Sequence, residues 1–435
     1  RIDVQANTAV NREIRAVEVV LVLDNTGSMG NNNNISKLKT ASQNFVNIMF
    51  DAARNDSLVK IGLVPYANAV RIGSYGLGKN PDGSQYADGR VFVNMPNGYS
   101  YTNNHNTEDR SKWFGCVIEY NADGWDLTSL NNDPYPNDVL DEHEGPWEMY
   151  RYSRLYNVDY RYRDWPGYFV YGGNEYLLYE DNRHATNCPY SQVVPLTSDR
   201  EFLQDAIGDP DNNSDGMRAH GNTLGNIGLA WGGRLISPEP PFEEGADWDN
   251  YYWDKAIVMM TDGANTRDSY YSAFWSAPHN QLNTNDYNER LAETCEDLKE
   301  KGVTIYTVTF TGGANASTRE YYKNCASSQD KYKHTDDPDE LVSVFEGIAR
   351  ELNLQLLGQQ QEVLFEEVRP SPIITREPRW AGRTRTNKLV FCAANSPITV
   401  GDISDVEIVD ATAWSLRGQV VSGNGTQSDR KSSLA

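Results

Sequence analysis

Residues 17–29, VEVVLVLDNTGSM, decide the fold that this sequence predicts. The segment 17–23 is an almost continuous apolar run, and it ends at Asp24. A short apolar run bounded by polar residues is typical of a parallel strand that is buried on both faces. A loop rich in Gly and Asn follows at 27–34, and apolar residues then recur at helical spacing over 36–53. We therefore expect a buried strand, a polar loop and a helix in that order.

The same alternation returns further along the chain. Short apolar runs predict buried strands over 59–66, 193–196, 255–260 and 303–310. Helical patterns cover 221–235, 287–301 and 338–352. A further helix is expected to open at Ser198, because Glu201 three residues later completes a capping box. Strands that alternate with helices predict an α/β fold with a doubly wound, mostly parallel sheet.

Two parts of the chain interrupt this alternation. The segment 77–190 is dense in Asn, Asp, Gly, Tyr and Trp and has no helical periodicity, so it predicts a large insertion. Its aromatic residues either pack this loop-heavy insertion or form a carbohydrate- or protein-binding face. The segment 353–435 predicts a β-rich module with a flexible tail, to which 1–15 is expected to add a strand. The expected α/β domain therefore consists of 16–76 and 191–352.

Charge and hydropathy restrict the class of partner. The 435 residues carry a formal net charge of −22, with 61 acidic and 39 basic side chains. Such a field repels phosphate backbones and anionic lipids, so nucleic acid and membrane surfaces are not expected partners. No apolar run reaches the ~20 residues that span a bilayer. The chain opens at Arg1 without a signal peptide, so we expect a mature or truncated form, with membrane anchoring only through a segment upstream.

Five cysteines predict two disulfides and one remaining thiol. Cys295 lies on a predicted helix and Cys325 follows the next strand, while Cys116 and Cys188 flank the aromatic-rich region. We expect these to pair as Cys295–Cys325 and Cys116–Cys188, which leaves Cys392. Five buried thiols in a cytosolic protein are the alternative. Disulfides indicate an oxidising compartment, and so an extracellular or cell-envelope location.

Three polar clusters follow predicted strands or lie in loops beside them. They contain two carboxylates, Asp24 and Asp262, and three hydroxyls, Thr26, Ser28 and Thr223. The carboxyl ends of strands in an open α/β sheet are where ligands bind. Mg²⁺ takes about six oxygen ligands at ~2.0–2.1 Å, and it commonly keeps some of its waters. The sequence therefore predicts a site for Mg²⁺, or for Mn²⁺ or Ca²⁺, whose remaining positions are open to a partner.

These residues resemble a known signature. DNTGS at 24–28 is similar to the Asp-x-Ser/Thr-x-Ser motif of the metal-ion-dependent adhesion site in von Willebrand factor A domains. Thr223 is similar to the family's single Thr, and Asp262 to its second Asp. The resemblance covers about half of the chain, 16–76 and 193–352. It implies that Ser28, Thr26 and Thr223 ligate the ion, that the two Asp hold it directly or through water, and that a partner's acidic side chain completes the shell.

A narrower likeness is to the TadG-like proteins of bacterial tight-adherence (Flp) pilus assembly. The blocks that carry it include VLVLDNTGSM, KIGLVPYANAV, GNTLGNIGLAWGGRLISPEPPF and MMTDGANT. Those relatives are exported envelope proteins. The likeness implies a role in adhesion or pilus assembly, whereas the β-rich tail departs from the pattern of many members.

A second cation site is predicted with less support from spacing. Asp211, Asn213 and Asp215 alternate before Gly216, like the first half of a calcium loop, but Asn222 stands where a bidentate Glu is needed. An ordinary acidic turn is the alternative. No Ser-His-Asp, GxSxG or phosphate-loop pattern is present in the sequence, so we expect no enzyme.

Three functions compete on this evidence. The first is a secreted or envelope adhesion protein that binds a protein ligand through the metal. The second is a structural subunit of an extracellular filament or surface layer, suggested by open β edges in the tail and by Cys392. The third, a metal-dependent hydrolase, lacks an obvious general base beside the metal.

Overall fold

The computed structural model describes residues 16–52, 56–95, 97–106, 109, 111–117, 147–148, 168–171, 174–177, 188–250, 252–266, 284–354, 360–369, 378–384, 389–393, 398–411 and 416–421. The predicted strand within 1–15 therefore lies outside the described residues. These residues form two compact units, one within 1–42 and 58–342, and the other within 43–57 and 343–435.

The first unit is built on an eight-stranded sheet. Its strands are β1 (Ala16–Asp24), β2 (Val59–Tyr66), β3 (Val70–Arg71), β7 (Cys116–Val117), β11 (Val194–Thr197), β12 (Trp253–Thr261), β13 (Thr304–Phe310) and β14 (Tyr332–Thr335). Their order is β14-β13-β12-β1-β2-β3-β7, and β11 also pairs with β2. The five strands from β14 to β2 run parallel, whereas β3, β7 and β11 are antiparallel to their partners.

The parallel centre of the sheet confirms the α/β class. Val19 to Leu23 in β1 have no exposed surface, as the uninterrupted apolar run predicts for a central strand. Five of the eight strands are parallel, in agreement with the prediction of a mostly parallel sheet, and an antiparallel edge makes the sheet mixed. This edge arises because β3 turns back directly after β2, and because β7 of the insertion pairs with β3 and extends the sheet.

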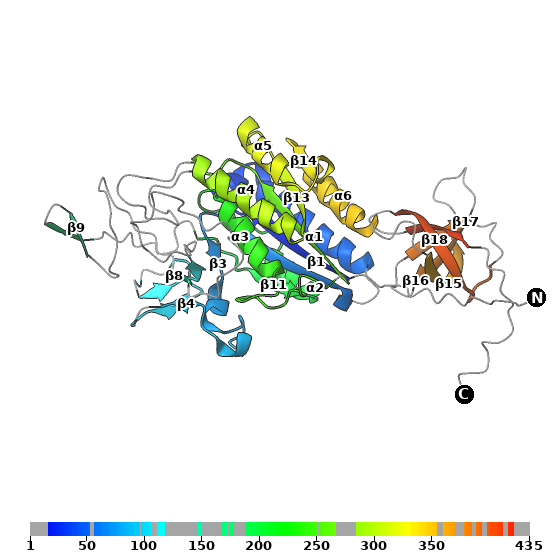
Figure 1. The fold of residues 1–435 in the computed structure, drawn as a ribbon, viewed down its shortest axis with the longest axis horizontal. Helices are drawn as coiled ribbons and strands as arrows, with labels where there is room; N and C mark the ends of the chain where they lie inside the picture. The colour runs from blue at the N-terminus through cyan, green and yellow to red at the C-terminus, as the bar shows by residue number, and fades with distance from the viewer. Residues whose placement is uncertain are drawn as a thin grey trace, which may run out of the picture. The chain divides into compact units, whose positions relative to one another are not determined.

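Helices account for most of the remaining structure of the α/β part. They are α1 (Asn34–Ala52), α2 (Arg200–Ile207), α3 (Gly225–Ile236), α4 (Thr284–Glu300), α5 (Ala316–Cys325) and α6 (Glu340–Leu354). Short 3₁₀ turns are Gly27–Asn33, Asp56–Leu58, Gly73–Leu77, Ala87–Gly89 and Gln329–Lys331. Figure 1 shows α3, α4 and α5 side by side over the sheet, with α3 against β1 and β2.

Helix α3 approaches the sheet closely because of two glycines one helical turn apart. A Cβ on Gly228 would lie 2.6 Å from the ring of Tyr66, and one on Gly232 would lie 2.7 Å from Val22. The absence of these two side chains lets the helix axis lie near the strands. Since Thr223 lies two residues before the start of α3, this close packing also sets the position of one predicted metal ligand.

The cap of α2 differs from the sequence prediction. Asp199, rather than Ser198, is the N-cap residue, and its carboxylate accepts the backbone N–H of Phe202 at 3.0 Å. The Ser198 hydroxyl instead donates to the carbonyl oxygen of Val59 on β2 at 2.9 Å. Both residues suit an N-cap, and the tertiary contact with β2 determines which of them takes it.

The insertion contributes short paired strands to the first unit. They are β4 (Val93–Asn94) with β8 (Trp147–Glu148), β5 (Ser100–Tyr101) with β6 (Lys112–Trp113), and β9 (Tyr168–Tyr171) with β10 (Asn174–Leu177). Trp113 and Trp147 are fully buried in the same apolar cluster as Trp231 of α3. The ring centroids of Trp147 and Trp231 lie 5.1 Å apart. These described aromatic residues therefore serve packing, the more ordinary of the two predicted uses.

Both predicted disulfides are present. Cys116 joins Cys188, and Cys295 of α4 joins Cys325 at the end of α5. Four of the five cysteines are thus paired, as the sequence predicts. The alternative of five free thiols is wrong for this structure.

The second unit contains a closed five-stranded barrel. Its strands are β15 (Gln360–Arg369), β16 (Arg379–Thr384), β17 (Leu389–Ala393), β18 (Ile403–Ala411) and β19 (Leu416–Val420), in the order β15-β16-β17-β19-β18. Val363 and Phe365 are buried, whereas Leu364 and Glu366 between and after them are exposed. This alternation is the period of two that a half-buried strand requires, and it confirms the β-rich module.

Closure of the barrel removes the features that suggested polymerisation through the tail. The described strands of the barrel leave no open edge, because β15 pairs with both β16 and β18. Cys392 is 1% exposed in the barrel core, and burial raises the pKa of its thiol to about 12. A buried, protonated thiol is unreactive, so it does not suit a bridge between chains.

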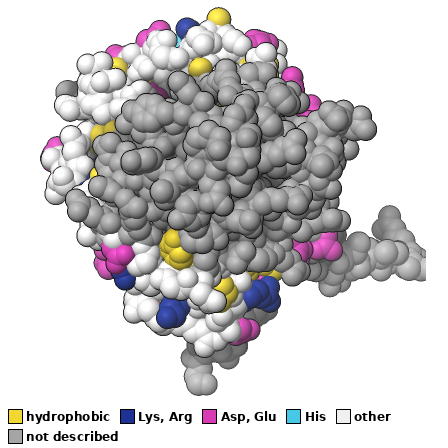
Figure 2. Space-filling view, turned by 90° about the vertical axis from the view of Figure 1, so that its left-hand side faces the viewer, with side chains coloured by type: hydrophobic (Ala, Val, Ile, Leu, Met, Phe, Trp, Pro, Cys, Tyr) yellow, Lys and Arg dark blue, Asp and Glu magenta, His cyan; other side chains and the backbone are white. Residues whose placement is uncertain are grey.

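The described surface is mixed in character. Figure 2 shows acidic, basic and apolar side chains scattered singly around the described part of one face. None of the described helices is long and apolar enough to cross a membrane.

Candidate metal centre

The two predicted carboxylates meet at the carboxyl edge of the sheet. Strands β1 and β12 are parallel neighbours, with Leu23 opposite Met260, so Asp24 ends one strand beside the end of the other. Asp262 follows β12 directly. The backbone N–H of Asp262 donates to Oδ2 of Asp24 at 3.2 Å. The parallel register therefore places two acidic residues that are 238 positions apart in contact.

Asp24 is held by its surroundings on both carboxylate oxygens. Oδ1 accepts the backbone N–H of Thr26 at 2.9 Å. Oδ2 accepts the Thr261 hydroxyl at 2.8 Å and lies 3.4 Å from the Tyr66 hydroxyl, in addition to the Asp262 N–H. The residue has no exposed surface. Its orientation is therefore fixed without any ion, which suits a group that acts on a metal directly or through water.

A chain of hydroxyls links the first loop to the second carboxylate. The Ser28 hydroxyl donates to Oδ1 of Asp262 at 2.6 Å, and the hydroxyls of Thr26 and Ser28 lie 3.0 Å apart. Thr26 is buried, whereas Ser28 is exposed. Four of the five predicted oxygen ligands thus form one hydrogen-bonded group that opens to solvent at Ser28.

Thr223 lies beside this group on a third loop. Its carbonyl oxygen accepts the N–H of Thr266 at 2.8 Å, and its Oγ1 lies 4.0 Å from the position of a Cβ on Gly263. The N–H of Gly27 donates to the carbonyl of Gly221 at 2.8 Å, which joins the first and third loops. The structure therefore brings all five predicted residues, or the backbone that carries them, to one place.

The electrostatics of this place favour a cation. Burial, and then the neighbouring Asp24, raise the pKa of Asp262 to about 7, and burial raises the pKa of Asp24 as well. Neither carboxylate has an ion-pair partner among the described residues. Two buried carboxylates in contact are costly unless a proton or a cation compensates them. Hydroxyl and carboxylate oxygens are hard donors, so the set fits Mg²⁺, Mn²⁺ or Ca²⁺.

Hydroxyl ligands are essential to this fit. Among the described residues, no group of three or more His, Cys, Asp and Glu side chains is placed to hold a metal. Two carboxylates alone are too few for a divalent ion that takes six ligands. The three hydroxyls, together with water or a partner, would have to supply the rest.

Sequence reasoning missed several residues that support the site. Tyr66 ends β2 opposite Asp24, and its hydroxyl also donates to the carbonyl of Met260 at 3.0 Å. Thr261 ends β12 and contacts Asp24. Both stand at strand ends, so the rule that located the two carboxylates could have located them too.

Thr311 supports the turn that carries Asp262. It follows β13, adopts φ = +60°, and places its hydroxyl 3.4 Å from the carbonyl oxygen of Asp262. A β-branched residue in the left-handed region is strained, and such strain persists only where surrounding contacts hold it. A Cβ on Gly313 would lie 2.4 Å from the same carbonyl, so this position needs glycine.

The predicted calcium loop is organised around a lysine. The ammonium of Lys39, on α1, donates to the carbonyl oxygens of Asp209, Asn212 and Asp215 at 3.0, 2.9 and 2.7 Å. Lys39 has no exposed surface, and burial lowers the pKa of its ammonium. The side chains of Asp211, Asn213 and Asp215 are on exposed residues, and Oδ2 of Asp215 accepts the N–H of Asp209. An internal cation thus holds this loop together, and calcium at the three side chains stays a prediction.

The raised pKa of Asp262 predicts how stability depends on pH in the metal-free chain. The folded state holds this proton up to about pH 7, whereas an ordinary Asp loses it near 3.8. Because the folded state then binds more protons, we expect the free energy of unfolding to fall as pH rises from about 4 to about 7. Urea unfolding in EDTA across this range measures the effect. Asp262→Asn should remove much of the slope, and an unchanged slope would contradict the prediction.

Comparison with family models finds a match in the C-terminal barrel. A TRAM domain model matches residues 355–421. The tRNA-2-methylthio-N(6)-dimethylallyladenosine synthase of Dictyoglomus thermophilum is 38% identical over 84 residues, which are 19% of this chain and 18% of that protein. The enzyme of the same name from Sulfurihydrogenibium is 34% identical over 86 residues, 20% of this chain and 18% of that protein. The chain therefore spans less than a fifth of the length of the curated relatives it matches.

Comparison with solved structures returns adhesion and matrix proteins at low similarity. The von Willebrand factor domain of the type V pilus tip protein Mfa5 from Porphyromonas gingivalis has 12% identity and a TM-score of 0.40, and the match covers 79% of this chain and 96% of that one. Proximal thread matrix protein 1 from the mussel byssus, with zinc in its MIDAS motif, has 11% identity and a TM-score of 0.35. This match covers 81% of this chain and 50% of that one. No partner or metal is carried over from these similarities.

Proposed function

We propose that this chain is a secreted or envelope-associated binding protein that holds a divalent cation at Asp24, Thr26, Ser28, Thr223 and Asp262. The cation, Mg²⁺ or a similar hard ion, accepts a carboxylate of a protein ligand at the solvent-facing position beside Ser28. The observation that carries the proposal is the contact between two buried carboxylates and a chain of hydroxyls at the end of the sheet. Binding rather than catalysis is proposed, because the described contacts of the two carboxylates include no histidine, cysteine or lysine that could act as general base.

The cysteines support the location. Two disulfides among four cysteines suit an oxidising compartment such as the cell surface or periplasm. The likeness of the site sequence to tight-adherence proteins makes pilus assembly the finer form of the proposal. A filament subunit is the alternative, but the closed barrel and buried Cys392 withdraw the support that the tail gave it.

The proposal is tested with an array of synthetic decapeptides that carry one glutamate in a Gly/Ser/Ala background. Matched peptides carry glutamine at the same position. We expect binding to the glutamate peptides alone, only with Mg²⁺ and not with EDTA, and not by Asp24→Ala, because the ion bridges the two carboxylates. Equal binding with Mg²⁺ and EDTA, or by Asp24→Ala, would reject the proposal.

A second candidate function concerns the barrel alone. The relatives that match this region are named for a reaction on tRNA, and residues 355–421 carry seven Lys and Arg against eight Asp and Glu. The net charge of −22 therefore lies almost entirely outside the barrel, which is not repelled by phosphate as the rest of the chain is. The barrel is therefore the one part of the chain that we consider for RNA contact.

Fluorescence anisotropy with bulk tRNA tests this second function. Binding at low salt that weakens steeply as salt rises, and that weakens in Arg379→Ala with Arg383→Ala, would support it. Arg369→Ala, which changes a β15 arginine paired with Glu367, is the matched control. Absence of binding at low salt would reject it. The two functions also require different compartments, which the number of free thiols in protein from its native source distinguishes. One free thiol indicates an oxidising compartment and supports the first function, whereas five indicate a reducing compartment and support the second.

A further inference from the structure

A cluster of rings lies against the candidate metal centre. The imidazole of His105 stacks on the ring of Tyr190, with centroids 3.8 Å apart and an interplanar angle of 18°. The ring of His220 meets both edge-on, at 4.9 Å from His105 and 5.4 Å from Tyr190. The guanidinium carbon of Arg218 lies 4.7 Å from the centroid of Tyr190. We call these four residues the Arg218 cluster.

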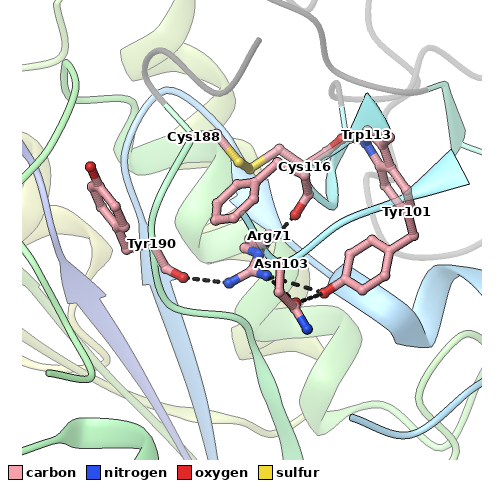
Figure 3. Close-up of a disulfide and its surroundings, with 8 residues drawn as sticks. Arg71, Tyr101, Asn103, Trp113, Cys116, Cys188 and Tyr190 are labelled. Carbon is pink, nitrogen blue, oxygen red and sulfur yellow. Dashed lines mark hydrogen bonds between the residues drawn. A yellow bond between two sulfur atoms is a disulfide. The ribbon is translucent and has the colours of Figure 1, made fainter. Parts of the chain in front are cut away.

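Tyr190 is fixed in place by the insertion. Arg71 of β3 donates to the carbonyl oxygens of Tyr190 and Phe114 and to the side chain of Asn103. Cys188, two residues before Tyr190, is bonded to Cys116 on β7. Figure 3 shows Arg71 at the centre of these contacts, below the disulfide and between Tyr190 and Tyr101. The ring beneath Arg218 is therefore preorganised, which lowers the entropy lost when a ligand binds there.

The segment that carries Arg218 runs along the metal-binding loop. The N–H of His220 donates to the carbonyl of Asn25 at 2.7 Å, and the carbonyl of Gly221 accepts the N–H of Gly27. One step earlier, Ala219 lies 3.5 Å from the position of a Cβ on Gly30. Residues 219–221 thus lie alongside residues 25–30, which contain Thr26 and Ser28. Arg218 directly precedes residues 219–221 in the chain.

Arg218 forms no ion pair with any of the residues that the structure describes. Its only described contact is with the ring of Tyr190, and its Nε is buried without an acceptor. Lys39 is the nearby cation; it binds the backbone carbonyls of Asp209 and Asp215, and neither of these residues forms a described ion pair with Arg218. A half-buried guanidinium without a carboxylate among the described residues is unexpected in a chain with a net charge of −22. A buried donor without an acceptor is unfavourable, and an arriving carboxylate would supply the acceptor.

We propose that Arg218 is a second anchor for an acidic protein ligand, so that it receives one carboxylate while the metal centre receives another. The inference rests on the proposed function and names its ligand more closely, as a segment with two acidic side chains. Arginine suits this role because its planar fork binds a carboxylate through two hydrogen bonds. The cation of the metal centre and the guanidinium would together attract an acidic segment, although the rest of the chain is negatively charged and repels it.

The test adds a second glutamate to the peptide array, at separations of one to six residues from the first. With Mg²⁺, the best two-glutamate peptide should bind the wild-type chain about tenfold more tightly than the one-glutamate peptide, the factor of one charge-assisted hydrogen bond. Arg218→Gln should lower binding of the two-glutamate peptide to the level of the other and leave the one-glutamate peptide unchanged. Arg218→Lys keeps the positive charge and loses the planar fork, so its affinity for the two-glutamate peptide should lie between those of the wild type and Arg218→Gln.

Arg90→Gln is the matched control, because it removes one positive charge from an exposed pair with Glu243. It should alter neither class of peptide. Equal weakening of both classes by Arg218→Gln, or no weakening of either, would overturn the role of Arg218 while leaving the metal-dependent function intact. Absence of any Mg²⁺-dependent binding by the wild-type chain would instead overturn the proposed function itself. Thermal unfolding of each variant checks that it is folded.

Discussion

Glu18→Ala is expected to destabilise the α/β unit by about 3–5 kcal/mol, the range for removing one partner of a buried ion pair. Glu18 lies in the centre of the sheet without exposed surface, opposite Lys60 on one side and Lys255 on the other. Its oxygens accept the ammonium groups of Lys60 at 3.0 Å and Lys255 at 2.6 Å, and also the N–H of Ala246. The variant leaves the buried ammonium of Lys255 without its carboxylate. Urea unfolding measures the loss.

The size of the effect depends on burial, which the controls examine. Glu243→Ala breaks an ion pair with Arg90 in which both side chains are about half exposed, so it should cost less than about 1 kcal/mol. Glu18→Leu combined with Lys255→Met should recover part of the loss, because the buried ammonium of Lys255 is removed with its carboxylate and the remaining Lys60 side chain is 25% exposed. If Glu18→Ala destabilised the protein no more than Glu243→Ala does, the predicted contribution of the buried contacts of Glu18 with Lys60 and Lys255 would be wrong.

Mg²⁺ is expected to raise the free energy of unfolding of the wild-type chain by about 2.7 kcal/mol when its free concentration is about a hundred times its dissociation constant. Asp262→Asn should abolish this gain, since an amide does not replace the carboxylate as a ligand. At pH 8 without metal, however, Asp262→Asn should be more stable than wild type, because it removes a negative charge that is buried beside Asp24. Asp262→Asn should thus be more stable than the wild type without metal and less stable than the wild type once Mg²⁺ is added. Thermal unfolding with Mg²⁺ and with EDTA measures both effects.

The metal response should also depend on pH. The ion displaces the proton that Asp262 holds up to about pH 7, so the apparent affinity for Mg²⁺ should rise with pH until that carboxyl is ionised. Asp249→Asn is the control and should keep the full gain, because Asp249 is exposed and precedes β12, whereas Asp262 follows the other end of that strand. A gain that survives in Asp262→Asn, or wild-type curves that coincide in Mg²⁺ and EDTA, would contradict the prediction.

The net charge of the whole chain does not describe the C-terminal barrel. Summed over 435 residues, −22 argues against nucleic acid as a partner. Residues 355–421 are nearly neutral, and they match a TRAM domain that the sequence interpretation did not recognise. Electrostatic interactions are screened over about 8 Å at physiological salt, so the charge of each module, rather than of the chain, decides what it attracts.

The residue pattern alone was enough to predict the parallel strands, the meeting of Asp24 with Asp262, and both disulfides. The first two of these features follow from local rules: an uninterrupted apolar run needs burial on both faces, and parallel strands end at one edge of the sheet. Only the tertiary structure decided that Lys39 fills the acidic loop, that Tyr66 and Thr261 hold Asp24, and that Glu18 has two lysine partners. Each of these contacts joins residues far apart in the chain, and the geometry that selects one partner among many exists only after the elements have packed.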